Sequence, residues 1–322
     1  MQALVCTEVG GVDNLRIEDR PTPEPQEGQV RVAIKAAGAS FVDALQAAGG
    51  YQFPLKAPYV PGAESAGLID AIGPGVTGWS VGDRVFVSAQ GAFASHIIAK
   101  TQQLTLLPES IDFGRGASFL QVYATAWFGL KIRTLVRPGE VVMVTGAGGG
   151  VGLAAIDVAR SMGASVIAVA SSKEKRDLAM SVGAFAAIDP TTEDVKVRAR
   201  ELTDGKGIDV VYDVVGGDVS EAALRALKFD GRLLIVGFTA GIGRIPLNLV
   251  LLNNRTVIGV ELGGWIPRHT EENTAMRDQI LAAIASGELR PVAPFERPLA
   301  EGAEVMSELL TRRAVGKIVL IP

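Results

Sequence analysis

The chain has a single cysteine, Cys6, and only two histidines, His96 and His269, among its 322 residues. One thiol cannot form an intramolecular disulfide, and it cannot supply the four clustered thiolates of a structural zinc site. A catalytic zinc takes three protein ligands, typically cysteine and histidine, and the three residues of these types lie far apart in the sequence. We therefore expect no metal, and we expect Cys6 to be a small buried residue of the first strand.

The sequence also lacks a surplus of positive charge. It carries 31 Lys and Arg against 35 Asp and Glu, a formal net charge of −4. Because nucleic-acid binding depends mainly on neutralising phosphates, we expect no nucleic-acid partner. No apolar run is long enough to cross a bilayer without glycine or charge, and the first residues do not resemble a signal segment. These absences predict a cytoplasmic protein that does not associate with membranes.

Hydrophobic residues make up 48% of the chain and charged residues 20%, which is typical of a globular enzyme of two domains. Residues 1–121 are expected to form a β-rich domain. Residues 29–36 alternate polar and apolar side chains as a half-buried strand does, and residues 65–73 and 84–88 also read as strands. A short helix over residues 41–48 is predicted before a proline-rich loop.

From residue 122 onwards the pattern changes to alternating strands and helices. The predicted strands are residues 141–145, 165–170, 186–188, 208–214, 231–236 and 256–260. Six strands with intervening helices predict a doubly wound α/β domain, a parallel sheet of order 3-2-1-4-5-6, over residues 122–260. After residue 261 the alternation stops, so residues 261–322 are expected to return to the first domain. The substrate is expected between the two domains.

The glycine cluster after the strand 141–145 has the spacing of a dinucleotide-binding turn. Ala147, Gly149 and Gly152 give the A-x-G-x-x-G pattern, followed by apolar residues at helical spacing. One small residue turns the chain, one lets backbone N–H groups approach a pyrophosphate, and the last allows close packing of helix on strand. Glycine-rich turns also occur merely to make a turn. A second strand at the spacing of a βαβ unit favours cofactor binding.

The residues after the second strand indicate which dinucleotide binds. NAD-binding units place an Asp or Glu there to accept from the ribose 2′-OH, whereas this chain has Ala170, Ser171 and Ser172. Three cations follow, Lys173, Lys175 and Arg176, which suits a 2′-phosphate. The pattern predicts NADPH rather than NADH. The alternative is that these cations form only the solvated start of the next helix.

Several motifs in order carry a resemblance to a known family. They are VPGAESAG at residues 60–67, VGDRV at 81–85, GAFASHII at 91–98, the glycine turn, IDVVYDVVGGD at 208–218, GRLLIVGF at 231–238 and GKIVLIP at 316–322. Together they resemble the medium-chain dehydrogenase/reductase superfamily, in particular its zinc-free quinone oxidoreductase branch, which includes ζ-crystallin. The resemblance implies a GroES-like catalytic domain of residues 1–121 and 261–322 and a Rossmann domain of residues 122–260. Where zinc-dependent relatives carry Gly-His-Glu, this chain has Gly62, Ala63 and Glu64.

The resemblance also implies functional residues. The catalytic candidates are Ser40, Asp43 and Tyr51, and Ser40 departs from the asparagine usual in the family; Tyr51 is equally consistent with a loop aromatic that covers the cleft. Lys175 and Arg313 match residues that contact the 2′-phosphate, while Pro190 replaces a tyrosine that often completes the group. The full cofactor-binding set expected is Thr125, Ala147, Gly148, Gly149, Gly150, Val151, Gly152, Ser171, Ser172, Lys175, Val236, Gly237, Phe238 and Arg313.

Without a metal, the acceptor must already be electrophilic. The first hypothesis is an NADPH:quinone oxidoreductase that transfers hydride or electrons to a small quinone. The alternative is an NADPH-dependent reductase of the carbon–carbon double bond of alkenals, enones or enoyl thioesters. A third hypothesis is a non-catalytic protein that binds NADPH or RNA. The resemblance further implies a homodimer joined through residues 256–262.

Overall fold

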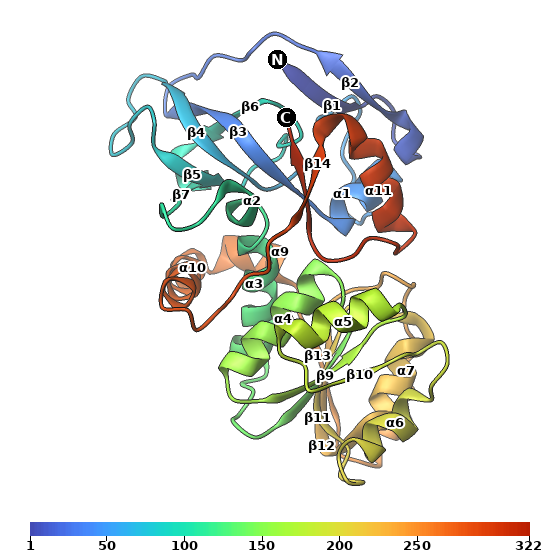
Figure 1. Ribbon diagram of the computed structural model, residues 1–322. Coiled ribbons are helices and arrows are strands. Elements are labelled where there is room, and N and C mark those ends of the chain that lie inside the picture. Colours follow the sequence, from blue (N-terminus) through green and yellow to red (C-terminus); the bar gives the residue numbers. More distant parts are fainter. The chain divides into compact units, whose positions relative to one another are not determined.

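The computed structural model describes residues 1–322, which form two compact units (Figure 1). The first unit comprises Met1–Phe119 and Ala293–Pro322, and the second comprises Leu120–Val292. No helix in either unit has the length and apolar character needed to span a membrane.

The first unit is built on a largely antiparallel sheet. Seven strands follow the order β14-β15-β3-β4-β5-β7 with β6 pairing on β3, and β1 and β2 form a separate pair. The strands are β1 (Gln2–Cys6), β2 (Leu15–Asp19), β3 (Gln29–Ala39), β4 (Ser65–Ile72), β5 (Arg84–Val87), β6 (His96–Lys100), β7 (Leu104–Leu106), β14 (Phe295–Pro298) and β15 (Ile318–Ile321). The helices are α1 (Phe41–Ala47), α2 (Phe113–Gly116) and α11 (Gly302–Leu310).

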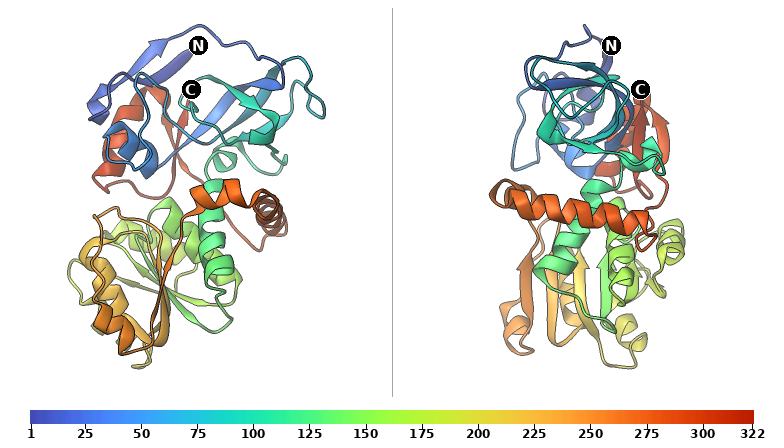
Figure 2. Two further views of the ribbon diagram at one scale, coloured as in Figure 1. Left: turned by 180° about the vertical axis from the view of Figure 1, so that it is seen from behind. Right: turned by 90° about the vertical axis from the view of Figure 1, so that its left-hand side faces the viewer.

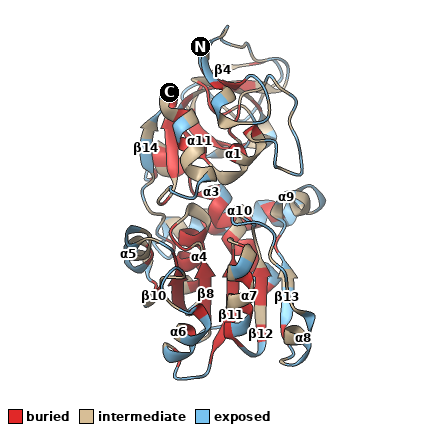
Figure 3. Ribbon diagram, turned by 90° about the vertical axis from the view of Figure 1, so that its right-hand side faces the viewer, coloured by how far each residue is buried: buried red, intermediate tan, exposed pale blue.

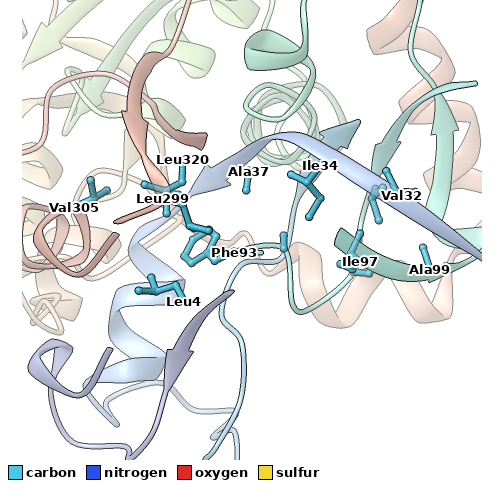
Figure 4. Packing of buried hydrophobic residues seen from close by; sticks show 14 of the residues in the cluster. Leu4, Val32, Ile34, Ala37, Phe93, Ile97, Ala99, Leu299, Val305 and Leu320 are labelled. Atoms are coloured by element: carbon cyan, nitrogen blue, oxygen red, sulfur yellow. The ribbon is translucent and has the colours of Figure 1, made fainter. Parts of the chain in front are cut away.

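Residues from both ends of the chain make one core in this unit. Val32 on the long strand β3 is buried, as its alternating pattern predicts. It belongs to a cluster with Leu4 and Phe93 from the N-terminal segment and Leu299 and Leu320 from the C-terminal segment (Figure 4). The last thirty residues are therefore part of this core and not an appendage.

The second unit is a parallel six-stranded sheet of order β10-β9-β8-β11-β12-β13, which confirms the predicted doubly wound topology. Helices α4 and α5 cover one face, and α6 and α7 cover the other (Figure 1). The strands are β8 (Val141–Thr145), β9 (Ser165–Val169), β10 (Ala186–Ile188), β11 (Ile208–Asp213), β12 (Leu227–Ile235) and β13 (Thr256–Gly259). The helices are α3 (Leu120–Trp127), α4 (Gly150–Ser161), α5 (Lys173–Val182), α6 (Val195–Glu201), α7 (Gly217–Ala226), α8 (Leu247–Leu251), α9 (Leu262–Trp265) and α10 (Thr270–Ala285).

The boundary near the C-terminus differs from the sequence expectation. The second unit extends to Val292, whereas the sequence places the return to the first domain at residue 261. The reason is α10, which packs against α3 (Figure 2). Met276 and Ile280 of α10 are buried. Only β14, α11 and β15 rejoin the first unit. Loss of the strand–helix alternation thus marks the end of the sheet, not the end of the unit.

Candidate functional site

The turn between β8 and α4 has the geometry expected of a dinucleotide-binding loop. Gly146 adopts a positive φ of 63°, and the N–H of Gly149 donates to its carbonyl at 3.1 Å. A methyl group on Gly152 would lie 2.3 Å from the carbonyl oxygen of Gly146, so only glycine lets helix and turn approach this closely. Gly149 precedes α4 without a side-chain cap, which leaves the first helical N–H groups, from Gly150 and Val151 onwards, oriented for an anion.

Lys175 lies over this turn. A methyl group on Gly148 would come within 2.3 Å of the Lys175 Cβ atom, so the lysine stem packs directly on the glycine. Ser172 fixes the start of α5 by accepting from the Lys175 N–H at 3.3 Å. The residues that follow β9 are the buried Ala170 and the exposed Ser171. No carboxylate therefore stands at the end of this strand.

The other two cations of the basic cluster are held in ion pairs. Lys173 pairs with Asp177 at 2.6 Å along the exposed side of α5. Arg176 pairs with Asp189 at 2.8 Å and donates to the carbonyl of Ala170. Asp189 directly precedes Pro190 in the loop after β10. Of the three cations, Lys175 is the one whose side chain packs on the glycine turn.

Most of the remaining predicted cofactor residues follow the carboxyl ends of strands. Val236 and Gly237 follow β12, and both donate their N–H groups to the carbonyl of Asp213. Phe238, next in the chain, is half exposed. Ala147 is buried within the glycine turn. Because these segments follow parallel strands, they share the carboxyl edge of the sheet, where α/β proteins bind ligands.

Two predicted residues lie away from the strand ends. Thr125 is on α3, where its hydroxyl donates to the carbonyl of Gln121 at 2.8 Å, and α3 packs against α4. Arg313 belongs to the first unit, is exposed, and donates from Nε to the Thr311 hydroxyl at 3.1 Å.

In the first unit, Ser40 and Asp43 are brought together at the start of α1. The Asp43 carboxylate accepts from the N–H of Ser40 at 2.9 Å and from its hydroxyl at 2.6 Å, while the Ser40 hydroxyl accepts from the N–H of Asp43. This capping box leaves Asp43 only 1% exposed. Burial raises the pKa of Asp43 to about 6, against the opposing effects of the Ser40 hydrogen bond and the Lys317 charge. Tyr51 lies in the loop after α1, with its ring edge-on to Phe53 at 5.8 Å.

A buried ion pair beside Asp43 was not singled out from sequence. Lys317 Nζ contacts Glu64 Oε1 at 2.6 Å, and the side chains are 10% and 2% exposed. Three buried oxygens in this region have no hydrogen-bond partner, Asp43 Oδ1, Glu64 Oε2 and Ser65 Oγ. Glu64 and Lys317 are each within a family motif, but they are separated by 253 positions. Nothing local in the sequence indicates their pairing.

The residues present do not fit a zinc ion. Ala63 occupies the position of the histidine ligand in zinc-dependent relatives. Cys6 is buried in β1, where desolvation raises the pKa of its thiol. His96 faces Asp70 at 3.4 Å on the sheet of the first unit. No cluster of three or more His, Cys, Asp or Glu side chains has the geometry to hold a metal ion.

Two family models match the chain. The alcohol dehydrogenase GroES-like domain matches residues 26–123, and the zinc-binding dehydrogenase model matches residues 150–279. A quinone oxidoreductase of Pseudomonas aeruginosa is 36% identical over 97% of both chains. A quinone oxidoreductase-like protein 2 homolog of Nematostella vectensis is 35% identical over 99% of this chain and 88% of its own length.

Solved structures agree with these matches over the whole chain. The Escherichia coli quinone oxidoreductase complexed with NADPH superimposes with a TM-score of 0.91 at 29% identity, over all of both chains. A mycobacterial protein complexed with NADPH gives 0.91 at 32% identity, also over all of both chains. Given these matches and the absence of a zinc-ligand set, the chain belongs to the medium-chain dehydrogenase/reductase superfamily, in its zinc-free quinone oxidoreductase branch.

Proposed function

We propose that this protein is an NADPH-dependent reductase whose acceptor is a small quinone. The observation that carries the choice of NADPH is the packing of Lys175 on Gly148, at a strand end that lacks a carboxylate. A cation at this position favours a 2′-phosphate, and a carboxylate would favour a free 2′-OH. The relatives named quinone oxidoreductase and the two neighbours complexed with NADPH support the same reading.

In this proposal the chain binds and orients the dinucleotide, which supplies a hydride from its nicotinamide ring. The uncapped N–H groups at the start of α4 hold the pyrophosphate, and the close approach at Gly152 keeps the turn in place. Lys175 would hold the 2′-phosphate. Val236, Gly237 and Phe238, which follow β12 at the carboxyl edge of the sheet, would hold the nicotinamide end of the dinucleotide.

Ser40 and Asp43 are proposed to supply the proton for the reduced acceptor. While Asp43 is ionised, the Ser40 hydroxyl donates to its carboxylate. When Asp43 Oδ2 carries a proton, that oxygen donates to Ser40, and the serine O–H becomes free to donate to an acceptor oxygen. With a pKa of about 6, both forms of Asp43 are populated near neutral pH. Tyr51 is proposed as a second donor to the same acceptor oxygen.

A second candidate function is reduction of a conjugated carbon–carbon double bond. The CurK enoyl reductase superimposes with a TM-score of 0.88 at 25% identity. A phthioceranic acid synthase of Mycobacterium tuberculosis is 32% identical over 92% of this chain, which covers 14% of that much longer protein. Quinones and conjugated double bonds both accept a hydride without a metal. The residues that contact the acceptor would therefore decide between the two functions.

Turnover of NADPH and NADH against a benzoquinone, a naphthoquinone, a short alkenal and crotonyl-CoA tests the proposal. We expect quinone turnover with a lower KM for NADPH than for NADH. Turnover of only the alkenal or the thioester would favour the second candidate. NADPH binding without any turnover would favour a binding protein, and equal KM values would contradict the NADPH preference.

A charge-removing substitution sharpens the cofactor test. Lys175→Met is expected to raise the KM for NADPH about tenfold and to leave the KM for NADH unchanged, since a charge-assisted bond contributes about 1.5 kcal/mol. Lys206→Met is the matched control, because Lys206 is exposed in the turn that precedes β11, at the opposite edge of the sheet. An equal change for both cofactors would show that Lys175 acts only on packing.

We also propose that the protein forms a homodimer through β13. This strand is the edge of the parallel sheet, and it and α8 are largely exposed (Figure 3). Ile242, Leu247, Leu251 and Leu252 are between 69% and 81% exposed in the segment that precedes β13. An open strand edge beside exposed apolar side chains is suited to pairing with a second copy. Sedimentation is expected to give a dimer, and a monomer at micromolar concentration would contradict this.

A further inference from the structure

The second unit contains a fully buried carboxylate whose oxygens are all hydrogen-bonded. Asp213, at the end of β11, is 0% exposed. Its side chain accepts four hydrogen bonds, from the hydroxyls of Thr145 (2.5 Å) and Ser220 and from the N–H groups of Val215 (3.0 Å) and Gly216 (3.3 Å). A buried carboxylate is stable only when donors satisfy it in this way. Thr145 closes β8, Val215 and Gly216 follow β11, and Ser220 lies on α7.

The bond to Thr145 joins the two strands at which the sheet order reverses. Strand β8 pairs with β9 on one side and with β11 on the other, and the connections run outward in opposite directions from this pair. Thr145 closes β8 and immediately precedes the glycine turn. Its hydroxyl donates to Asp213 and also accepts from the N–H of Val214 at 3.2 Å. Each of the two strand ends therefore donates one hydrogen bond to the other.

Side chains and backbone add to this connection. A methyl group on Gly146 would lie 2.5 Å from the Val214 Cγ2 atom, so the turn after β8 packs directly on the turn after β11. The backbone carbonyl of Asp213 accepts from the N–H groups of Val236 at 2.8 Å and Gly237 at 3.2 Å. Asp213 thus holds the carboxyl ends of three adjacent strands, β8, β11 and β12.

We propose that Asp213 and Thr145 are positioning residues of the dinucleotide site, which set the glycine turn relative to the segment after β12. This inference rests on the proposed NADPH binding. Neither side chain needs to touch the ligand, because both act through the backbone N–H groups that do. The hydrogen bond between Asp213 and Thr145 fixes the turn after β8 relative to the turn after β11. An apolar contact alone would allow these turns to shift.

The test compares two isosteric substitutions at opposite edges of the sheet. Thr145→Val removes the hydroxyl that joins the two turns. Thr203→Val removes a hydroxyl with the same pattern, since Thr203 is also buried, donates to the carbonyl of Ala199 and accepts from the N–H of Gly207 at 2.9 Å. Gly207 directly precedes β11, so this control lies at the amino edge. Both variants are expected to lower the melting temperature, and Thr145→Val by more, because its hydroxyl donates to a carboxylate whereas that of Thr203 donates to a backbone carbonyl.

Fluorescence titration with NADPH well below the melting temperature separates the two sites. Thr145→Val is expected to raise the NADPH Kd about tenfold, and Thr203→Val is expected to change it less than twofold. An equal change in both variants, or less than twofold in Thr145→Val, would overturn the proposal.

A second measurement does not depend on the cofactor. Amide hydrogen exchange without ligand is expected to be faster at residues 146–152 in Thr145→Val, and unchanged there in Thr203→Val. Unchanged exchange in Thr145→Val would also overturn the positioning role. If wild-type protein binds no NADPH while exchange still differs in this way, the positioning role stands and the proposed cofactor is wrong.

Discussion

Asp213 in the second unit and Asp43 in the first are both buried aspartates, but their surroundings differ. Asp213 is 0% exposed and accepts from four donors, with both carboxylate oxygens engaged. Asp43 is 1% exposed, and only its Oδ2 atom accepts hydrogen bonds, both from Ser40. Its Oδ1 atom has no partner.

This difference separates two uses of a buried charge. Enough donors around Asp213 replace the water it loses, so the side chain acts as a fixed junction between strands. Asp43 loses its water without full replacement, and burial therefore raises its pKa to about 6. A carboxyl of this kind changes protonation near neutral pH, which suits proton transfer more than support. Three predictions test this contrast.

The largest effect is expected from Lys317→Met. Glu64 would be left almost fully buried without its counter-charge, which costs about 3–5 kcal/mol in the free energy of unfolding. The pKa of Asp43 would also rise, because the Lys317 charge lowers it in the wild type. Urea denaturation at pH 7 measures the loss.

The double variant Lys317→Met with Glu64→Gln is the control for this loss. It removes both charges and should recover most of the stability, since a neutral side chain no longer needs a counter-ion. If the single and double variants were equally unstable, the loss would come from packing of the lysine stem and not from the buried charge of Glu64.

A smaller effect is expected from the titration of Asp43 itself. A carboxyl with a higher pKa in the folded than in the unfolded chain binds more protons when folded, so stability falls as pH rises between the two values. For Asp43 these are about 6 in the folded protein and 3.8 in the unfolded chain. The wild type is therefore expected to lose up to about 3 kcal/mol between pH 4 and pH 7 relative to Asp43→Asn.

Asp43→Asn is a suitable reference because the asparagine oxygen can still accept from Ser40 and keep the capping box. All other titrating groups are common to both proteins and cancel in the comparison. The measurement is the free energy of unfolding of both proteins in urea at several pH values. Parallel curves from pH 4 to pH 8 would show that Asp43 is not a titrating group in this range.

The sequence predicts the parts of this molecule that depend on local patterns. The order of the parallel sheet follows from six apolar runs, and the glycine spacing locates the turn after β8. Ser40 and Asp43 are also close in sequence, but they were predicted only as catalytic candidates, and the capping box that joins them comes from the structure. What the sequence does not reveal is burial of a charge, because this depends on elements that come from distant parts of the chain.

Asp213 shows why such sites are missed. It closes the apolar run of β11 and reads as an ordinary polar strand end, but its partner Thr145 is 68 positions away. The Glu64–Lys317 pair spans most of the chain for the same reason. The extent of the second unit was also not predicted, because α10 is placed by its contact with α3 and not by any strand beside it.

The smallest effect is expected from Asp213→Asn, the same substitution made at the other carboxylate. The asparagine oxygen can replace Oδ1 and accept from Thr145, Val215 and Gly216. Its amide group then faces Ser220, whose hydroxyl can rotate to accept instead of donate. The loss at pH 7 should therefore be only about 1–2 kcal/mol, the value of exchanging charge-assisted bonds for neutral ones.

Urea denaturation of Asp213→Asn and Asp43→Asn at pH 7 then gives opposite signs. Asp213→Asn lowers stability because it removes a fully satisfied charge, while Asp43→Asn raises it because it removes a charge that the protein satisfies poorly. If both variants were destabilised to the same degree, both aspartates would stabilise the fold in the same way. This result would contradict the proposed role of Asp43 in proton transfer.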